Sequence, residues 1–449
     1  MSFARRMRFG YFGVMLLALV APARAQRKAP DNVKWTSPDD NRFQWLNVAD
    51  WEPKMGGLQP VRMPKTWRDK IPERSAERAL STAGVAVRFR TDSNRIAIRL
   101  TFIDVPEAAN ASPESTWERA RPPYFDVYRD GKFLANVPAK VAYYQQDVTL
   151  FDIAMGARQE SEFSILFPHY YRNAEVIVGG IGLDADAQLL PSARQNLPVV
   201  LFHGDSITHG HGVTSPRETY VWQTCERANC EPLNLGFGGS AWTDVSVAQY
   251  IASRNDWNVL VLMVGTNSFG GNDSQGNREN LAQYQAKYGQ FLDTIRAKYP
   301  TKPILCVTPI LTHQDITQQK NKNGDLPQDY RNAIQQVVQK RQQMDHNLYF
   351  LDGLKLIDDP LYLMVIDQVH PNEAGSLRMA EGIAERLRPI LQSLNVEEAN
   401  FSRENDFRGS RESSKLIERH KHVDAKTLQI TMTARIPQAQ SRGSGSYGN

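Results

Sequence analysis

Two patterns of apolar positions divide the chain. Between residues 43 and 190, apolar and polar residues alternate, as in GVAVRFR (84–90) and RIAIRLTF (95–102). Such alternation predicts strands with one buried face, and the turn residues TDSN between these two strands predict a hairpin. FDVYRDGKFLANV predicts a second hairpin with Asp130-Gly131 at its tip, and SEFSILF and AEVIVGGI predict further strands. We therefore expect an all-β sandwich over 43–190, after a loose polar lead-in at 26–42.

The pattern changes between residues 196 and 395. Five short apolar runs, PVVLFHG, PLNLGF, WNVLVLMVG, KPILCVTPI and NLYFLDG, are continuous and alternate with helical stretches. Continuous runs are typical of strands buried on both faces, and strand–helix alternation predicts a parallel, doubly wound sheet. The predicted fold class is therefore α/β, a flavodoxin-like three-layer domain with a five-stranded parallel sheet. Ligands of such sheets lie at the carboxyl ends of the strands.

Both ends of the chain differ from these two regions. Residues 1–25 combine Arg5, Arg6 and Arg8 with a short apolar run and a closing ARA, which predicts a secretory signal peptide cleaved before Gln26. Residues 398–449 are polar and predicted to be mostly disordered, apart from an alternating stretch at 427–436 that could form a strand. We expect a secreted or periplasmic protein with no stable membrane insertion after cleavage.

The charge balance excludes a class of partners. Four of the 53 basic residues and none of the 49 acidic residues lie in residues 1–25, so the remainder has no formal net charge. This leaves no electrostatic argument for binding nucleic acid or an anionic membrane. The sequence does not indicate an oligomeric state.

Three cysteines leave two alternatives open. Cys225 and Cys230 are close enough in sequence for a disulfide in an oxidising compartment, and otherwise all three cysteines, with Cys306, are free thiols. Their spacing does not indicate a metal site.

Candidate catalytic residues follow the predicted strands. Ser206 comes directly after the first apolar run, in VVLFHGDSITHGHG. A serine hydroxyl needs an adjacent base to act as a nucleophile, and His370 in DQVHPN is the candidate. Asp367, three residues earlier, is placed to orient the imidazole. In a flavodoxin-like strand order the ends that carry these residues can meet.

A tetrahedral intermediate also needs hydrogen-bond donors for its oxyanion. We expect the backbone N–H of Ser206, the backbone N–H of Gly239 in GFGG, and the side-chain amide of Asn267 in VGTN to supply them. Asn272, in a downstream GGND, is the alternative to Asn267. Asn267 is preferred because it directly ends an apolar strand.

GDSIT, NLGFGGS, VGTN and DQVHP, in this order, resemble the four sequence blocks of the SGNH (GDSL-type) hydrolase superfamily over roughly 196–395. STAGVAVRFRTDSNRIAIRL resembles the β-rich N-terminal domain of some bacterial members. The resemblance implies an acyl-ester hydrolase with Ser206 as nucleophile, Asp367 and His370 completing a triad, Gly239 and Asn267 as oxyanion donors, and Asp205 supporting the serine turn. Ser268 departs from the pattern, which usually has Asp after the asparagine.

Other side chains near these blocks have less specific predictions. His203 is expected to be packed or hydrogen-bonded, while His209 and His211 are expected at the rim or in contact with substrate rather than on zinc. Trp242 either stacks against a sugar or packs in the core. The polar loop at 312–329 could shape the cleft.

The sequence as a whole predicts an exported serine esterase that hydrolyses O-acyl groups, especially acetyl, on a polysaccharide or small-molecule ester without metal or organic cofactor. The sandwich is either a carbohydrate-binding domain or a structural companion. One alternative is an inert glycan-binding or scaffold protein on the same fold. Another is a lipase or thioesterase.

Overall fold

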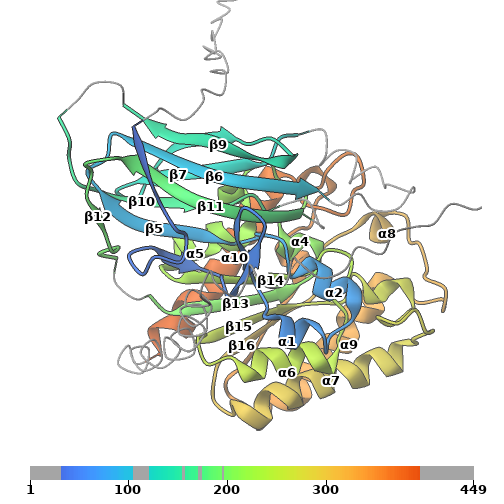
Figure 1. Ribbon diagram of the computed structural model, residues 1–449. Coiled ribbons are helices and arrows are strands. Elements are labelled where there is room, and N and C mark those ends of the chain that lie inside the picture. The colour runs from blue at the N-terminus through green and yellow to red at the C-terminus, as the bar shows by residue number, and fades with distance from the viewer. Residues whose placement is uncertain (1–31, 105–120, 154–156, 170–173, 195–196, 395–449) are drawn as a thin grey trace, which may run out of the picture.

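The computed structural model describes residues 32–104, 121–153, 157–169, 174–194 and 197–394 (Figure 1). They form a β-rich N-terminal part followed by an α/β part. The predicted signal peptide at 1–25, and the predicted tail at 398–449 with its strand at 427–436, lie outside the described residues and stay predictions. No described helix has the length and apolar character needed to cross a bilayer.

Two antiparallel sheets make up the N-terminal part. One has the order β3-β4-β11-β6-β9 with β1 beside β11, and the other has the order β12-β5-β10-β7-β8 with β2 beside β5. Apolar side chains from both sheets share one core, as the alternating pattern requires for a sandwich. The strands are β1 (Val33–Thr36), β2 (Gln44–Leu46), β3 (Asp50–Lys54), β4 (Gly57–Val61), β5 (Ala86–Thr91), β6 (Arg95–Asp104), β7 (Tyr124–Arg129), β8 (Lys132–Pro138), β9 (Ala142–Asp152), β10 (Ser161–Leu166), β11 (Ala174–Asp184) and β12 (Leu189–Leu190).

One of the two predicted hairpins is correct. β7 and β8 pair around Asp130 and Gly131, which both have positive φ, as a tight hairpin turn requires. The hairpin predicted across residues 91–94 is wrong. β5 pairs with β10 in one sheet and β6 pairs with β11 in the other, so the TDSN turn carries the chain from one layer of the sandwich to the next.

The N-terminal part also contains structure that the sequence pattern did not indicate. β1 lies within the stretch predicted as a loose lead-in and pairs with β11. Two short helices, α1 (Lys65–Arg68) and α2 (Glu73–Arg78), each begin after a proline and interrupt the strands. The region keeps the predicted sandwich, and α2 packs against the α/β part.

The α/β part has the predicted parallel sheet. Its order is β14-β13-β15-β16-β17, the flavodoxin-like arrangement in which the first strand lies between the second and third. These strands are β13 (Val199–Gly204), β14 (Glu231–Gly236), β15 (Val259–Met263), β16 (Ile304–Val307) and β17 (Leu348–Leu351). All five coincide with the continuous apolar runs.

Helices cover both faces of this sheet (Figure 1). The larger ones are α5 (Tyr220–Ala228), α6 (Val245–Ser253), α7 (Leu281–Lys298), α9 (Pro327–Gln342) and α10 (Glu373–Gln392). On β13, Leu201 packs into the core with α6, α7 and α9, while Val200 and Phe202 pack into the core with α5 and α10. Burial on both faces explains why the strand sequences do not alternate.

Cys225, Cys230 and Cys306 are free and buried. Of the two alternatives left open by the sequence, the structure therefore has free thiols rather than the Cys225–Cys230 disulfide.

A buried ion pair joins the two parts of the chain. Arg88 of β5 donates from Nη1 to Glu231 Oε1 of β14 over 2.5 Å, and both side chains are almost fully buried. We expect Arg88→Met to lower the free energy of unfolding by about 3–5 kcal/mol, because it leaves the Glu231 carboxylate buried without its partner. Urea unfolding measures this. Arg88→Met combined with Glu231→Leu should recover most of the loss, and equal destabilisation by the double variant would contradict the assignment.

Candidate active site

Ser206 lies where β13 meets α4 (Ser206–His209), a single helical turn. Asp205 caps this turn, because its Oδ1 accepts a hydrogen bond from the Ile207 backbone N–H over 2.9 Å. β14 passes so close that a Cβ on Gly236 would lie 2.2 Å from the His209 nitrogen. The turn is therefore held on both sides, and the Ser206 hydroxyl is fixed at the carboxyl end of β13.

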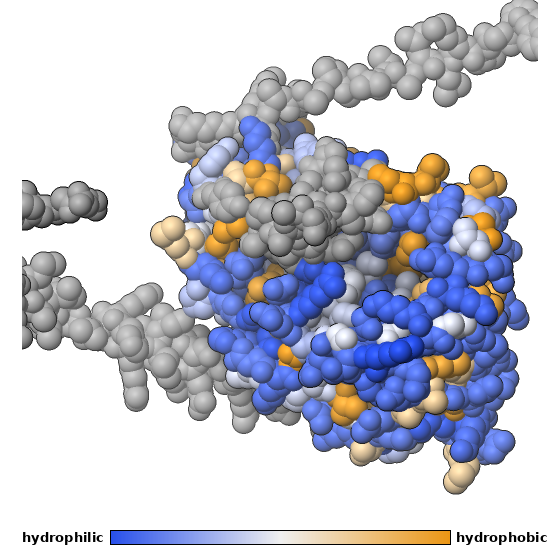
Figure 2. All heavy atoms as spheres, turned by 90° about the vertical axis from the view of Figure 1, so that its right-hand side faces the viewer, coloured by the Kyte–Doolittle hydropathy of each residue, from blue (hydrophilic) through white to orange (hydrophobic). Residues whose placement is uncertain are grey.

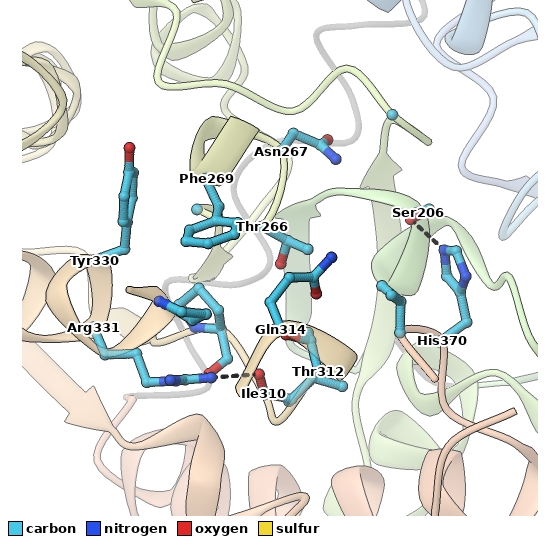
Figure 3. A pocket seen from close by; sticks show the side chains of 15 residues that line it. Ser206, Thr266, Asn267, Phe269, Ile310, Thr312, Gln314, Tyr330, Arg331 and His370 are labelled. Atoms are coloured by element: carbon cyan, nitrogen blue, oxygen red, sulfur yellow. Dashed lines mark hydrogen bonds between the residues drawn. The ribbon is translucent and has the colours of Figure 1, made fainter. Parts of the chain in front are cut away.

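His370 and Asp367 come from the segment between β17 and α10 and meet Ser206. His370 Nε2 is 2.7 Å from Ser206 Oγ (Figure 3). His370 Nδ1 is 2.6 Å from Asp367 Oδ2. Asp367 Oδ1 also accepts hydrogen bonds from the backbone N–H groups of Val369 and His370, at 2.9 and 3.1 Å. The structure thus brings together the three predicted residues, which are 164 positions apart at most.

The charge on Asp367 follows from these contacts. Burial raises the pKa of the carboxyl, but the hydrogen bond and charge of His370 and the two backbone N–H groups together lower it further. The net pKa lies below the usual value, so Asp367 is ionised at neutral pH and accepts a hydrogen bond from His370 Nδ1–H. This leaves Nε2 unprotonated and able to accept the hydroxyl proton of Ser206.

Gly239 and Asn267 line the same cavity as Ser206 and His370. Gly239 has φ 67°, a conformation that favours glycine. The Ala241 backbone N–H donates to Asn267 Oδ1 over 2.9 Å, so the amide nitrogen of Asn267 points into the cavity (Figure 3). The backbone of Asn272 instead forms an isolated β-bridge with that of Arg278, and Asn272 does not line the cavity. Of the two candidate asparagines, the structure places Asn267 beside Ser206.

The cavity has a volume of about 340 Å³. The loop after β16, predicted to shape the cleft, contributes Thr312, Gln314 and Pro327. Figure 3 shows the Gln314 amide projecting into the cavity, from the short helix α8 (His313–Ile316). The size lies at the lower end of the range of about 300–1,000 Å³ for small-molecule sites.

The sequence did not indicate several further lining residues, among them Phe269, Tyr330 and Arg331. Arg331 is buried and donates to the carbonyls of Pro309 and Ile310, each over 2.8 Å, and to Asp315. It therefore fixes the loop that forms one wall. Because Arg331 and Tyr330 lie inside the helical pattern of α9, no motif or turn marks them in the sequence.

Two known protein families match this chain. Residues 202–378 match the GDSL-like lipase/acylhydrolase family, and residues 33–189 match the N-terminus of SGNH-hydrolase-type esterases. The chain belongs to the SGNH hydrolase superfamily. Both family descriptions name enzymes that hydrolyse carboxylic esters, and the two matches follow the two structural parts. No curated protein matches the chain.

Several solved structures share the fold of this SGNH hydrolase. They include the salicylyl-acyltransferase SsfX3 from a tetracycline biosynthetic pathway (23% identity, TM-score 0.68, 81% of this chain and 99% of that chain). A putative GDSL-like lipase from Bacteroides ovatus is similar (20% identity, TM-score 0.62, 80% and 98%). A family two carbohydrate esterase from Clostridium thermocellum in complex with cellohexaose also aligns (16% identity, TM-score 0.54, 78% and 100%). At these identities the likeness concerns the fold.

The histidines near Ser206 lie deeper than expected. His209 and His211 do not lie at the rim, because both side chains are buried. His209 Nε2 is 3.1 Å from Ser81 Oγ, and its Nδ1 accepts from the Gly238 backbone N–H at 3.4 Å, while His211 packs against His370. Ser81 lies 128 residues from His209, a partner that no local pattern reveals.

The remaining candidates fall outside the cavity wall. Trp242 is partly buried and does not line the cavity, so its predicted contact with a sugar at the oxyanion turn has no support there. His203 is packed and hydrogen-bonded as predicted, with Nδ1 donating to Leu235 O over 2.9 Å. Within the described ranges, no group of three or more His, Cys, Asp or Glu side chains is arranged to hold a metal ion.

His203 and His209 predict a pH dependence of stability. Burial lowers the pKa of His203 to about 4 and that of His209 well below its usual value. In the unfolded chain both bind a proton near pH 6.5, so the unfolded state takes up more protons as pH falls from 6.5 to 4. We expect the free energy of unfolding to fall across this window by up to about 1.4 kcal/mol per pH unit for each histidine.

Urea unfolding at pH 7 and pH 5 measures this dependence. His203→Gln should reduce the difference between the two pH values, whereas His346→Gln, at an exposed position, should not change it. A difference that is the same in His203→Gln and in the parent protein would contradict the prediction.

Proposed function

We propose that this SGNH hydrolase is an exported serine esterase that removes O-acyl groups, especially acetyl, from carbohydrate. The observation that carries the proposal is the aligned series Ser206 Oγ, His370 and Asp367 beside a small cavity. The predicted signal peptide supports export. The likeness to a family two carbohydrate esterase seen with cellohexaose supports a carbohydrate ester as substrate.

In the proposed reaction, Ser206 Oγ bonds to the ester carbonyl carbon while its proton moves to His370 Nε2. Asp367 accepts from Nδ1–H and stabilises the imidazolium. The N–H groups of Ser206 and Gly239 and the Asn267 amide donate to the oxyanion. When the intermediate collapses, the alcohol leaves with the proton from Nε2 and the acyl group stays on Ser206.

Water completes the cycle through the same residues. It attacks the acyl carbonyl carbon and gives a proton to His370 Nε2. The oxyanion of the second tetrahedral intermediate accepts hydrogen bonds from the same three donors. Its collapse releases the acid and returns the proton to Ser206 Oγ. Asp205, which caps α4, and Arg331, which fixes the cavity wall, keep this geometry in place.

The cavity and the surrounding surface support a short acyl group on a polar alcohol. α4 and α8 lie on the right of Figure 1, and the surface on that side is mostly hydrophilic, with apolar residues in small separate groups (Figure 2). A volume of about 340 Å³ leaves little room for a long acyl chain beside a sugar. These features favour an acetylesterase over a lipase.

Acyl-chain selectivity tests the proposal. With p-nitrophenyl esters from acetate to dodecanoate, we expect kcat/KM to be highest for acetate and to fall with chain length. Acetate release from acetylated xylan should follow. Values of kcat/KM that rise with chain length would favour a lipase, and glycan binding without turnover of any ester would favour an inert binding protein.

A further inference from the structure

The loop that carries Gly239 is held by the β-rich part of the chain. Carbonyl oxygens at alternate positions from the end of β14 into this loop accept hydrogen bonds from buried side chains of residues 47–78. Asn47 and Arg62 donate to Asn234 O and Arg62 donates to Gly236 O at the end of β14, while Arg78 donates to Gly238 O and Ser75 to Ser240 O in the loop itself. The end of β14 and the loop after it are thus held through their peptide groups by side chains of the β-rich part.

Two of these contacts come from one face of α2. Ser75 and Arg78 are three residues apart, so they lie on the same side of the helix, and both are buried. Arg78 Nε is 3.0 Å from Gly238 O, and Ser75 Oγ is 2.8 Å from Ser240 O. Neither residue lines the cavity, so neither contacts a substrate there.

Each contact leads to one of the oxyanion donors. Gly238 C=O and Gly239 N–H belong to the same peptide group, so the Arg78 guanidinium orients that N–H and polarises it. Likewise Ser240 C=O and Ala241 N–H share a peptide group, and Ala241 N–H donates to Asn267 Oδ1 over 2.9 Å. Linked hydrogen bonds strengthen one another when they are buried.

We propose that Ser75 and Arg78 of α2 are positioning residues for the oxyanion site, Arg78 acting through Gly239 and Ser75 acting through Asn267. The β-rich part is then a component of the catalytic apparatus, and α2 is the element that provides it. This inference rests on the proposed function, because it requires an oxyanion at the Gly239 and Asn267 donors.

Steady-state kinetics of Ser75→Ala and Arg78→Gln test the role. Loss of an oxyanion donor itself costs about 10²–10³-fold in kcat, so the loss of its support should cost less, about three- to thirtyfold, with KM little changed. Arg78→Lys, which keeps the charge, should recover part of the loss. Arg74→Gln, which removes an exposed charge from the same helix, should leave kcat unchanged.

Two readouts separate positioning from a structural role. Titration of Ser206 with a fluorophosphonate gives the concentration of competent sites, so kcat is expressed per site. A boronic acid forms a tetrahedral adduct with the serine and resembles the transition state, so its inhibition constant should rise by the same factor as kcat falls. An unchanged kcat per site and an unchanged boronate affinity in both variants, whatever their melting temperatures, would overturn the inference.

A double-mutant cycle tests the route itself. In an Asn267→Ala background, Ser75→Ala should have no further effect on kcat, because its path to the oxyanion runs through Asn267. Arg78→Gln should still lower kcat in that background. If the loss of kcat in the double variant equalled the product of the losses in Ser75→Ala and Asn267→Ala alone, the assigned route would be contradicted. This cycle tests the inference even if Arg78→Gln does not fold.

Failure of the inference is distinguishable from failure of the proposed function. If Ser206→Ala abolishes turnover while the α2 variants retain the parent kcat per site and boronate affinity, only the inference fails. If turnover persists in Ser206→Ala, the proposed function itself fails.

Discussion

Ser206→Ala is expected to lower kcat for p-nitrophenyl acetate by about 10⁴-fold or more. The hydroxyl that the variant lacks is the atom 2.7 Å from His370 Nε2, and no other hydroxyl group is bonded to this imidazole among the described residues. The remaining site would still bind the ester and hold its carbonyl oxygen, so a small residual rate above that in water is expected. The fold should be unaffected, because the change removes one atom from a capped turn.

Initial rates at saturating ester, together with labelling by a fluorophosphonate, measure this loss. The parent protein should take up one label per chain and the variant none. Ser246→Ala, on α6 and outside the cavity lining, is the matched control and should keep the parent rate. A Ser206→Ala rate within tenfold of the parent rate would show that another group is the nucleophile.

The sequence predicted the α/β part well because its evidence is local. Continuous apolar runs identified all five strands of the parallel sheet, and strand–helix alternation implies parallel order. The site followed from the same rule, since Ser206, Gly239 and Asn267 each come after a strand and these ends meet at one edge.

In the sandwich, the local pattern did not predict which strands pair. Alternation states which face of a strand is buried, but it does not state which strand is the neighbour. β5 and β6 are consecutive and alternate in the same way, yet they belong to different sheets and face each other across the core. The pairing of β5 with β10 and of β6 with β11, strands 70 or more residues further on, distinguishes this arrangement from a hairpin.

Polar residues were misplaced for a related reason. His209 was expected at the rim or in contact with substrate, but it is buried, and Ser81 and Gly238 satisfy both of its ring nitrogens. α2 was missed because six residues are too few for helical periodicity to appear. Contacts between distant segments determine both the burial of His209 and the position of α2. The same contacts hold the β-rich part against the site.

Asp367→Asn is expected to lower kcat by about 10⁴-fold with little effect on folding. The reason lies in the second carboxylate oxygen. Oδ1 accepts two backbone N–H groups, from Val369 and His370, and only an oxygen can fill that position. The asparagine must therefore turn its NH₂ group toward His370 Nδ1, which then has to accept a hydrogen bond.

That orientation selects the wrong tautomer of His370. With Nδ1 accepting, the proton resides on Nε2, which can no longer take the proton of Ser206. Nitrogen chemical shifts of labelled His370 would report the change of tautomer, and initial rates would report its effect. Asp359→Asn, in the same segment, should be harmless because asparagine caps a helical turn as aspartate does. If Asp367→Asn retained a rate within tenfold of the parent, or kept the proton on Nδ1, the hydrogen bond between Asp367 and His370 would not be what sets the base, and Ser206 would need another source of activation.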